Sequence, residues 1–346
     1  MTLDFAIIVS TLEKMETTSS RIELTQHLVS LFKNTPAPIL DKVVYLIQGK
    51  IAPEYEGIEL GLAEKMVIRS ILSSSAVTTE KIYQLYRKTG DLGDTAKIIM
   101  ENKLQTTLLN EKVTVERIYE TFNKISKAVG KGSQEIKLRL LYSLLNDATS
   151  SECRFIIKFA LGTLRLGVAD FSILEALAIA FTEDKKYRKI IENAYNLSSD
   201  LGEVGKLLAT QGLAAVTSIK IQLFVPIRAM PAERVRTSQE VLEKMGGIAA
   251  AEFKLDGERV QIHAGAHRVA IFSRRLENIT EYYPDIVTLI SKSKLKDHIL
   301  EAEVVAIQES TGEYLPFQEL MHRRKKYNIQ EAATNYPISL NLFDIL

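Results

Sequence analysis

The spacing of apolar residues changes once along this chain, and that change constrains its fold more than any other feature. From the start to about Ile219, apolar residues mostly recur three or four positions apart, the period of an amphipathic helix. From Arg259 to Phe272 they alternate, the period of a strand. A segment with two prolines separates the regions. We therefore expect an all-α domain at residues 1–218 and an α+β domain with mostly antiparallel strands at residues 219–346.

The helical region also repeats itself. Residues 60–64 (LGLAE) match residues 166–170 (LGVAD) at an offset of 106, and residues 90–94 (GDLGD) match residues 199–203 (SDLGE) at an offset of 109. Near-equal offsets predict two copies of one helical unit. Glycines near helix ends can bring backbone N–H groups close to phosphates, although a leucine–glycine pair is more often a tight helix-packing site.

Composition limits the partners and the compartment. The 346 residues are 46% hydrophobic and 25% charged, which is ordinary for a soluble protein with two or three cores. The net charge is +1, so contact with a polyanion must come from local basic patches. The single cysteine, Cys153, is expected in the core and fits a reducing compartment. The sequence shows no signal peptide and no apolar run of membrane-spanning length, so we expect an intracellular, cytoplasmic protein without a membrane partner.

A lysine beside an Asp-Gly pair is the strongest candidate for chemistry. In residues 252–259 (EFKLDGER), Lys254 lies two residues before Asp256 and five before Arg259. A lysine amine is nucleophilic only when neutral, so it needs desolvation or nearby cations. Arg259 can be such a cation and can also bind phosphate or ribose oxygens. This group suits an amine that attacks phosphorus, although a surface hairpin with a Lys–Asp pair is commoner around Asp-Gly turns.

The region around and after Lys254 predicts a small set of elements. They are a helix at 232–245 that ends at two glycines, strands at 259–263 and 268–272, a helix at 284–290, and strands at 299–307 and 337–346. Lys254 is therefore expected just before a hairpin, on a rigid support that can position it.

Several motifs in order give a family resemblance. The pattern Lys-x-Asp-Gly-x-Arg resembles motif I of the covalent nucleotidyltransferases, the family of ATP-dependent DNA ligases, RNA ligases and capping enzymes. The segment FSRRLENIT at 272–280 looks like motif Ia of DNA ligases, residues 299–306 are similar to motif III, and residues 342–346 resemble motif IIIa. Residues 162–168 resemble part of the DNA-binding domain of archaeal and eukaryotic DNA ligases. Together the matches favour an ATP-dependent DNA ligase of that type.

The resemblance implies a role for each residue of the site. Lys254 would attack the α-phosphate of ATP and carry AMP as a phosphoramidate. The other implied contacts are Glu252 with the adenine amino group, Arg259 with ribose or phosphate, Arg274 with the nick phosphate, Glu303 with ribose or Mg²⁺, and Phe343 stacked on adenine. Taken singly, Glu303 could instead be an exposed strand residue and Phe343 a core aromatic.

For the helical domain, the resemblance implies contacts with the backbone of nicked double-stranded DNA and no reading of sequence. The candidate contacts are Gly61, Gly167, Arg69 and Arg165. The basic run at residues 322–326 is expected to be either a solvated helix face or a further backbone contact. His263 and His267 have a metal-like spacing, but the turn expected at Gly265 between them argues against a zinc site.

The family further implies ATP and Mg²⁺ as cofactors, a monomer, a sliding clamp as a candidate partner, and a place in DNA replication, repair and recombination. Motifs IV, V and VI and the oligonucleotide-binding domain are absent from the sequence, so we expect an incomplete chain that adenylates itself poorly or not at all. Two alternatives are a non-catalytic DNA-binding fragment and an RNA ligase or capping-type enzyme, the latter disfavoured by the long helical region.

Overall fold

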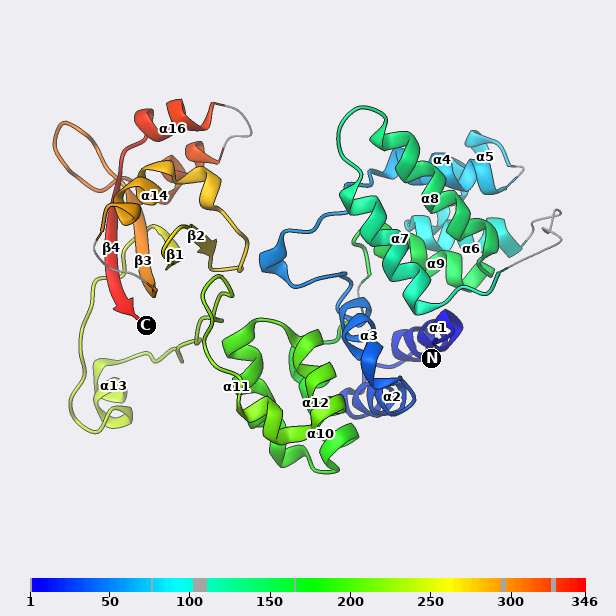
Figure 1. The fold of residues 1–346 in the computed structure, drawn as a ribbon, viewed down its shortest axis with the longest axis horizontal. Helices are drawn as coiled ribbons and strands as arrows, with labels where there is room; N and C mark the ends of the chain where they lie inside the picture. Colours follow the sequence, from blue (N-terminus) through cyan, green and yellow to red (C-terminus); the bar gives the residue numbers. More distant parts are fainter. Residues whose placement is uncertain (1, 76, 102–110, 165, 294–296, 325–327) are drawn as a thin grey trace. The chain divides into compact units, whose positions relative to one another are not determined.

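The structure is a computed structural model that describes residues 2–75, 77–101, 111–164, 166–293, 297–324 and 328–346. The chain forms two compact units (Figure 1). The helical unit comprises Met1–Pro53, Ile58–Tyr195 and Asp200–Ile219, and the sheet unit comprises Glu54–Gly57, Asn196–Ser199 and Lys220–Leu346. The predicted fold class is confirmed, because an all-α region precedes an α+β region with an antiparallel sheet. The division at residue 218 into domains of different function stays a prediction.

Within the described residues, two series of six α-helices make up most of the helical unit. The first series is α1 (Phe5–Glu16), α2 (Arg21–Lys33), α3 (Leu40–Ile47), α4 (Glu64–Ser74), α5 (Thr79–Thr89) and α6 (Leu92–Glu101). The second series is α7 (Val115–Lys127), α8 (Ser133–Asp147), α9 (Ser150–Ala160), α10 (Asp170–Thr182), α11 (Arg188–Ser198) and α12 (Leu201–Thr217). Each helix begins 106 to 112 residues before its counterpart, which agrees with the predicted internal repeat.

The first pair of matched segments has the same local structure in both copies. Gly61 and Gly167 both adopt the left-handed conformation, with φ of 58° and 65°. The alanines that follow, Ala63 and Ala169, precede α4 and α10 with φ/ψ of −83°/155° and −80°/153°. An added Cβ at Gly167 would meet nothing within 4 Å. These glycines therefore serve a turn, and the helix-packing interpretation is wrong for them.

The second pair of matched segments does serve packing. Asp91 and Asp200 each accept a hydrogen bond at 2.9 Å from the backbone N–H three residues later, at the start of α6 and α12. An added Cβ at Gly93 would lie 2.6 Å from a backbone oxygen of α9, and one at Gly202 would lie 2.5 Å from the ring of Tyr45 in α3. Both helices thus approach a neighbour too closely for any side chain.

The two series pack on each other crosswise. α4 lies against α8 and α10 against α2, while α6 lies against α9 and α12 against α3. Where each series begins, the N–H of Phe5 donates to the oxygen of Val113, and the N–H of Val115 donates to the oxygen of Leu3, both at 2.9 Å. Such reciprocal contacts relate the copies by an approximate twofold axis, so each copy completes the core of the other.

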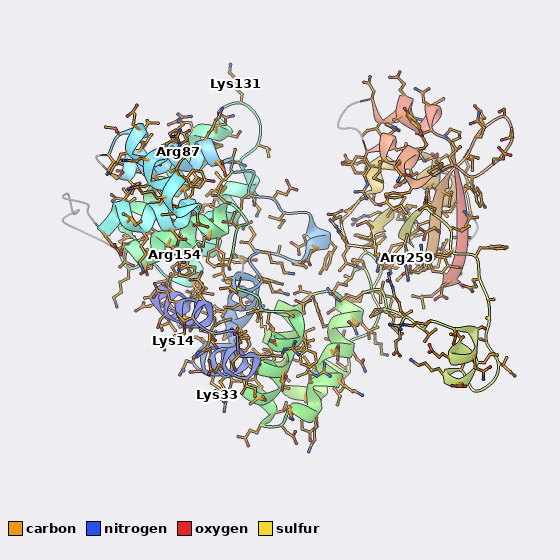
Figure 2. The ribbon with its side chains drawn as sticks, turned by 180° about the vertical axis from the view of Figure 1, so that it is seen from behind. Lys14, Lys33, Arg87, Lys131, Arg154 and Arg259 are labelled. Carbon is orange, nitrogen blue, oxygen red and sulfur yellow. The ribbon has the colours of Figure 1, made fainter. Side chains whose placement is uncertain are left out.

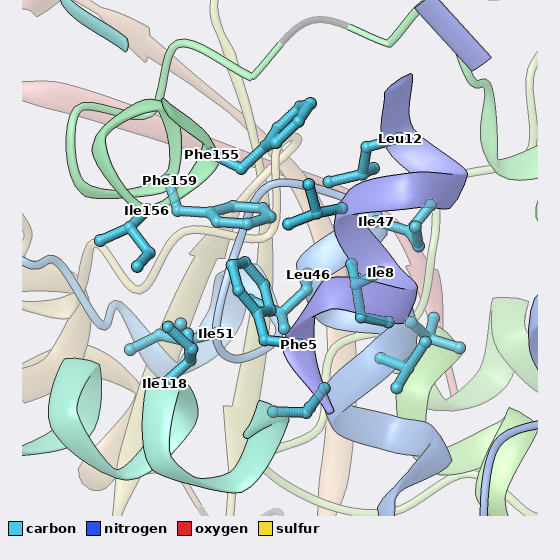
Figure 3. Packing of buried hydrophobic residues seen from close by; sticks show 14 of the residues in the cluster. Phe5, Ile8, Leu12, Leu46, Ile47, Ile51, Ile118, Phe155, Ile156 and Phe159 are labelled. Carbon is cyan, nitrogen blue, oxygen red and sulfur yellow. The ribbon is translucent and has the colours of Figure 1, made fainter. Parts of the chain in front are cut away.

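Figure 3 shows the centre of this core, where side chains of α1 and α3 meet those of α7 and α9. Phe5 and Ile118 are fully buried, and the ring centroids of Phe5 and Phe159 lie 6.2 Å apart. Truncating a buried phenylalanine to alanine costs about 3–5 kcal/mol. Cys153 of α9 is buried, as predicted. No helix in the described ranges is long and apolar enough to cross a membrane.

The sheet unit is built on four antiparallel strands in the order β2-β1-β3-β4. Its elements in the described residues are α13 (Ser238–Lys244), β1 (Glu258–Ala264), β2 (Val269–Ser273), α14 (Pro284–Ser291), β3 (His298–Ala306), α15 (Phe317–Leu320), α16 (Ile329–Asn335) and β4 (Ile338–Ile345), with short 3₁₀ turns between some of them. The predicted strands, and the helix that begins at Pro284, are confirmed within one or two residues.

The predicted helix at 232–245 is wrong at its start, because α13 begins only at Ser238. The side chain of Thr237 accepts a hydrogen bond from the N–H of Glu240, and the Glu240 carboxylate accepts one from the N–H of Arg236. These two hydrogen bonds cap the N-terminus of α13, so the helix begins at Ser238 and not at residue 232.

Alternation along β1 and β3 gives the sheet two different faces. The apolar face packs against α14 and α15 around Tyr283 and Ile286. The opposite face, called the polar face below, carries Arg259, Gln261 and His263 of β1 and Glu301 and Glu303 of β3. Chemistry-bearing side chains of two strands are thereby gathered on one side of the sheet.

Candidate functional site

The loop that carries Lys254 is anchored at its Asp-Gly pair. An added Cβ at Gly257 would lie 2.3 Å from the backbone oxygen of Val304, so this position lies directly against β3. The Oδ2 atom of Asp256 accepts a hydrogen bond at 3.2 Å from the N–H of Phe317, the first residue of α15. Lys254 lies just before β1, the position that we predicted, and its side chain is exposed. The pair is not a hairpin turn, because the β1–β2 turn lies at residues 265–268.

Arg259, Glu303 and Phe343 come together on the polar face. Arg259 of β1 lies opposite Glu303 of β3, and its guanidinium carbon lies 5.2 Å from the ring centroid of Phe343 (Figure 2 labels Arg259). The register between β3 and β4 shifts at residues 301 and 302, so that Phe343 has no partner in β3. This bulge turns the ring toward Arg259. Phe343 is 48% exposed, so its ring is not part of a core formed by the described residues.

Glu303 is half-buried between strands and charged groups. Burial raises the pKa of its carboxyl above the ordinary value, while the charges of Lys254 and Arg259 and a hydrogen bond from the Gly257 backbone act in the opposite direction. The side chain of Asn341 donates to the backbone oxygen of Glu303 at 3.3 Å. The structure thus brings Glu303 within electrostatic reach of both Lys254 and Arg259.

Among the described residues, Glu252 and Arg274 form no polar contact with the group formed by Arg259, Glu303 and Phe343. Both side chains are exposed, Glu252 in the loop before β1 and Arg274 just after β2. Within the described part of the chain, neither forms a hydrogen bond or ion pair with Arg259 or Glu303. Their predicted contacts with adenine and with the nick phosphate stay predictions.

Sequence reasoning missed the buried carboxylate that holds Arg259. Glu301 is 6% exposed, and its Oε2 accepts a hydrogen bond from Arg259 Nε at 2.8 Å. Its Oε1 accepts one from Gln261 Nε2 at 2.5 Å. The signal was available, because Glu301 and Glu303 lie two residues apart on one strand and so share a face. The same spacing relates Gln261 to Arg259.

Of the three described residues of the basic run at 322–326, His322 and Arg324 are exposed, as a solvated face requires, but Arg323 is not. Arg323 is fully buried, with Nη2 at 2.8 Å from Asp285 Oδ2 and its guanidinium carbon at 5.1 Å from the ring centroid of Tyr283. A guanidinium so enclosed needs the carboxylate and the ring to replace its water. Residues 325 and 326 of the run lie outside the described residues.

Arg324 is exposed, but its guanidinium reaches a buried carboxylate. It pairs with Glu258, which is 9% exposed and accepts a second hydrogen bond from the Tyr283 hydroxyl at 2.6 Å. Burial next to this carboxylate raises the pKa of Tyr283. Because Glu258 directly follows Gly257, this buried group fixes the start of β1 behind the Lys254 loop.

The possible metal ligands are few. Among the described residues, no group of three or more His, Cys, Asp or Glu side chains could hold a metal ion. His263 is fully buried, and its two ring nitrogens form hydrogen bonds inside the unit. Mg²⁺ often binds through one or two carboxylates together with substrate phosphates, and Glu303 offers one such carboxylate beside Lys254. The described residues therefore fit a Mg²⁺ ion that takes one carboxylate ligand from the protein and most of its other ligands from the substrate phosphates and water.

In the helical unit, three of the four candidate contact residues lie in the described part of the chain, and their contacts with DNA stay predictions. Gly61, Gly167 and Arg69 are exposed, whereas Arg165 lies outside the described residues. The residue of α10 at the position of Arg69 is Glu175, so this charge is not repeated in the second copy. Labelled basic side chains are spread over several elements of this unit (Figure 2).

A cavity of 640 Å³ lies beside the Gly61 turn. It is lined by residues 58–63 and by the ends of α3 and α9, including the left-handed Gly49 and Gly162. Lys137 supports the turn, because its Nζ donates to the oxygen of Leu60 at 2.7 Å. The lining therefore combines apolar side chains with the backbone of three glycines, Gly49, Gly61 and Gly162.

Two protein-family models match the chain. One, described as DNA ligase N terminus, matches residues 4–178, and the other, described as ATP dependent DNA ligase domain, matches residues 229–346. The first match disfavours the RNA ligase and capping-type alternatives.

Curated relatives cover nearly the whole chain. A DNA ligase of Nitrosopumilus maritimus is 56% identical over 345 residues, and one of Cenarchaeum symbiosum is 52% identical over 345 residues; each alignment covers 99% of this chain and 59% of the relative. DNA ligase 2 of Thermofilum pendens is 46% identical over 351 residues, covering 99% of this chain and 58% of the relative. The chain thus spans about 59% of the length of these relatives.

Proposed function

The chain belongs to the ATP-dependent DNA ligase family, and from that premise we propose that it forms the DNA-holding and nucleotide-binding parts of an enzyme that seals nicks in duplex DNA. One observation carries the proposal. The exposed Lys254 lies on a loop anchored against β3, and both Lys254 and Arg259 lie within electrostatic reach of Glu303. Arg259 also contacts the half-exposed ring of Phe343.

In the first step, the amine of Lys254 attacks the α-phosphorus of ATP. A nitrogen–phosphorus bond forms, the bond from that phosphorus to the bridging oxygen breaks, and pyrophosphate leaves. Arg259 would bind the ribose or the phosphate, and Phe343 would stack on adenine, which orients the base at little entropic cost. Glu252 would accept a hydrogen bond from the adenine amino group. The anchored loop supports this assignment, since attack requires an amine held close to the phosphorus.

Mg²⁺, when bound, would neutralise part of the charge on the phosphates. Glu303 is the side chain that would hold it, together with oxygens of the substrate. Its carboxyl would be more readily ionised beside Lys254 and Arg259 than burial alone allows.

The later steps use the same lysine as a leaving group. An oxygen of the 5′-phosphate at the nick attacks the lysine-bound phosphorus, and the nitrogen–phosphorus bond breaks. The 3′-hydroxyl then attacks the 5′-phosphorus, and AMP leaves. Arg274, exposed after β2, would bind the nick phosphate.

The helical unit would hold the duplex by its backbone. The turns at Gly61 and Gly167 precede α4 and α10 in equivalent places of two copies related by an approximate twofold axis. Helix N-termini bind anions, and the strands of duplex DNA are themselves related by local twofold axes, so the two turns could meet phosphates of both strands. Monomeric state, a sliding-clamp partner and cytoplasmic location stay predictions.

The test is transfer of label from α-labelled ATP to the complete gene product in the presence of Mg²⁺. We expect covalent label on the wild type and on Lys292→Ala, an exposed lysine at the end of α14, but none on Lys254→Ala. Label retained on Lys254→Ala would overturn the assignment of the nucleophile. Absence of label on every variant would favour a non-catalytic DNA-binding function.

A further inference from the structure

The segment that enters the sheet unit is held on the polar face by side chains. The N–H of Ile227 donates to Gln261 Oε1 at 2.7 Å, and Gln261 Nε2 donates to the oxygen of Ile227 at 3.2 Å. One side-chain amide thus gives Ile227 both hydrogen bonds that a neighbouring strand would give it. Neither function of the chain described above uses this contact.

His263 adds a second attachment two residues further along β1. The N–H of Phe224 donates to His263 Nδ1 at 2.9 Å, and His263 Nε2 lies 2.8 Å from Gln261 Oε1. Because Nδ1 accepts, the ring proton must lie on Nε2, where it donates to Gln261. The ring is fully buried, and burial lowers its pKa to about 4. These contacts define one neutral tautomer.

Phe224 is itself in an unusual conformation. Its φ is 70°, a left-handed value that costs a non-glycine residue roughly 1–3 kcal/mol. Its ring lies 4.6 Å from the guanidinium carbon of Arg268, and an added Cβ at Gly265 would come within 3.0 Å of it. The conformation is therefore held by the hydrogen bond to His263 and by the packing of the ring over the β1–β2 turn.

The attachment continues into the site. Gln261 Nε2 also donates to Glu301 Oε1 at 2.5 Å, and Glu301 Oε2 accepts from Arg259 Nε at 2.8 Å. Glu301 is 6% exposed, so its two oxygens have little water with which to replace these partners. An unbroken series of hydrogen bonds thus leads from Phe224 to Arg259, and Arg259 contacts Phe343.

We propose that Gln261 and His263 are positioning residues for the adenylation reaction. They clamp residues 224–227 on the polar face and, through Glu301, fix the guanidinium of Arg259 where ATP must bind. The clamp itself is a feature of the fold, whereas its catalytic consequence rests on the proposed function. None of these three side chains needs to touch the substrate.

The clamp is tested by amide hydrogen exchange of the complete gene product. The peptide that contains Phe224 and Ile227 should be protected in the wild type and should exchange at least about tenfold faster in Gln261→Met, which removes the hydrogen bonds at similar volume. His263→Asn keeps an acceptor at the same number of bonds from the backbone as Nδ1, so it should retain protection that His263→Phe loses. Wild-type exchange in Gln261→Met and His263→Phe would overturn the clamp.

The positioning role is tested by adenylation kinetics on the same variants. Gln261→Met should lower kcat/KM for ATP by roughly tenfold to a hundredfold with a raised KM, because a small displacement of an orienting group is costly. Gln330→Met, at an exposed position of α16, is the matched control and should match the wild type. A merely structural role would reduce the active fraction and leave KM unchanged.

The two proposals fail separately. If the wild type takes up no label from ATP, the proposed function fails while the exchange experiment still decides the clamp. If Gln261→Met loses protection at Ile227 yet keeps the wild-type KM and kcat, the coupling through Glu301 to Arg259 is refuted.

Discussion

Replacing Gly257 by alanine should displace the loop that carries Lys254. The new Cβ would lie 2.3 Å from the oxygen of Val304, 2.9 Å from Cγ2 of Val305 and 3.0 Å from Cγ of Glu303. Ordinary contact begins at about 3.4 Å, so the loop and β3 must separate by about 1 Å. The nearest obstacle is backbone, which cannot rotate away as a side chain can.

Two magnitudes follow from that displacement. Overpacking of this kind costs about 1–3 kcal/mol of stability. A 1 Å shift of a reacting group can cost about a hundredfold in rate. Glu303 is moved by the same substitution, so the group that carries part of the active-site charge shifts together with the lysine.

The assay is the single-turnover rate of label transfer from ATP, measured beside thermal unfolding. We expect Gly257→Ala to remain folded, with a midpoint lower by several degrees, and to react about a hundredfold more slowly. Ala251→Ser, an exposed change in the same loop, should behave as the wild type. A folded Gly257→Ala protein that reacts at the wild-type rate would refute the claim that close contact with β3 positions the lysine.

Three further outcomes are expected. Between pH 6.5 and about 4 the unfolded chain binds a proton at His263 that the folded chain does not, so lowering the pH through this window decreases the free energy of unfolding by up to about 3 kcal/mol. Denaturant titrations should show that His263→Asn lacks this part of the loss. An equal loss in both proteins would contradict the prediction. Phe343→Ala should raise KM for ATP about tenfold, while Phe343→Tyr keeps it, and an unchanged KM in the alanine variant would exclude stacking on this ring. Tyr283→Phe should destabilise the protein by about 1–3 kcal/mol, because the buried Glu258 carboxylate loses a donor, and unaltered unfolding would show that this hydrogen bond contributes nothing.

Hydrophobic periodicity was sufficient to predict the all-α region, the α+β region and the strands of the sheet. Alternation places Arg259 on one side of β1 and Glu303 on one side of β3, and both sides prove to be the same face. The Asp-Gly pair was singled out from the sequence as part of the site, and its glycine, Gly257, lies against β3. The local sequence was enough for these features. The face on which a strand residue lies follows from the alternation of side chains, and a glycine leaves room for a neighbouring backbone.

Long-range pairing could not be predicted in this way. The bulge in β4 that turns Phe343 toward Arg259 depends on register with β3, which strand period leaves open. The pairing of Arg324 with Glu258 joins residues 66 positions apart, and a basic run gives no sign of which member will find a buried carboxylate. The hydrogen bonds between Gln261 and the backbone of Ile227 also join residues far apart in the sequence, 34 positions, and no local pattern predicts them.

The central claim is that the amine of Lys254 becomes bonded to the phosphorus of AMP. The most direct measurement is mass-spectrometric mapping of the adduct, after the complete gene product is incubated with ATP and Mg²⁺ and digested under conditions that preserve phosphoramidates. We predict one adenylated peptide, containing residues 252–259, with the modification on Lys254. An adduct on another residue, or none in a folded protein that binds ATP, would contradict the account.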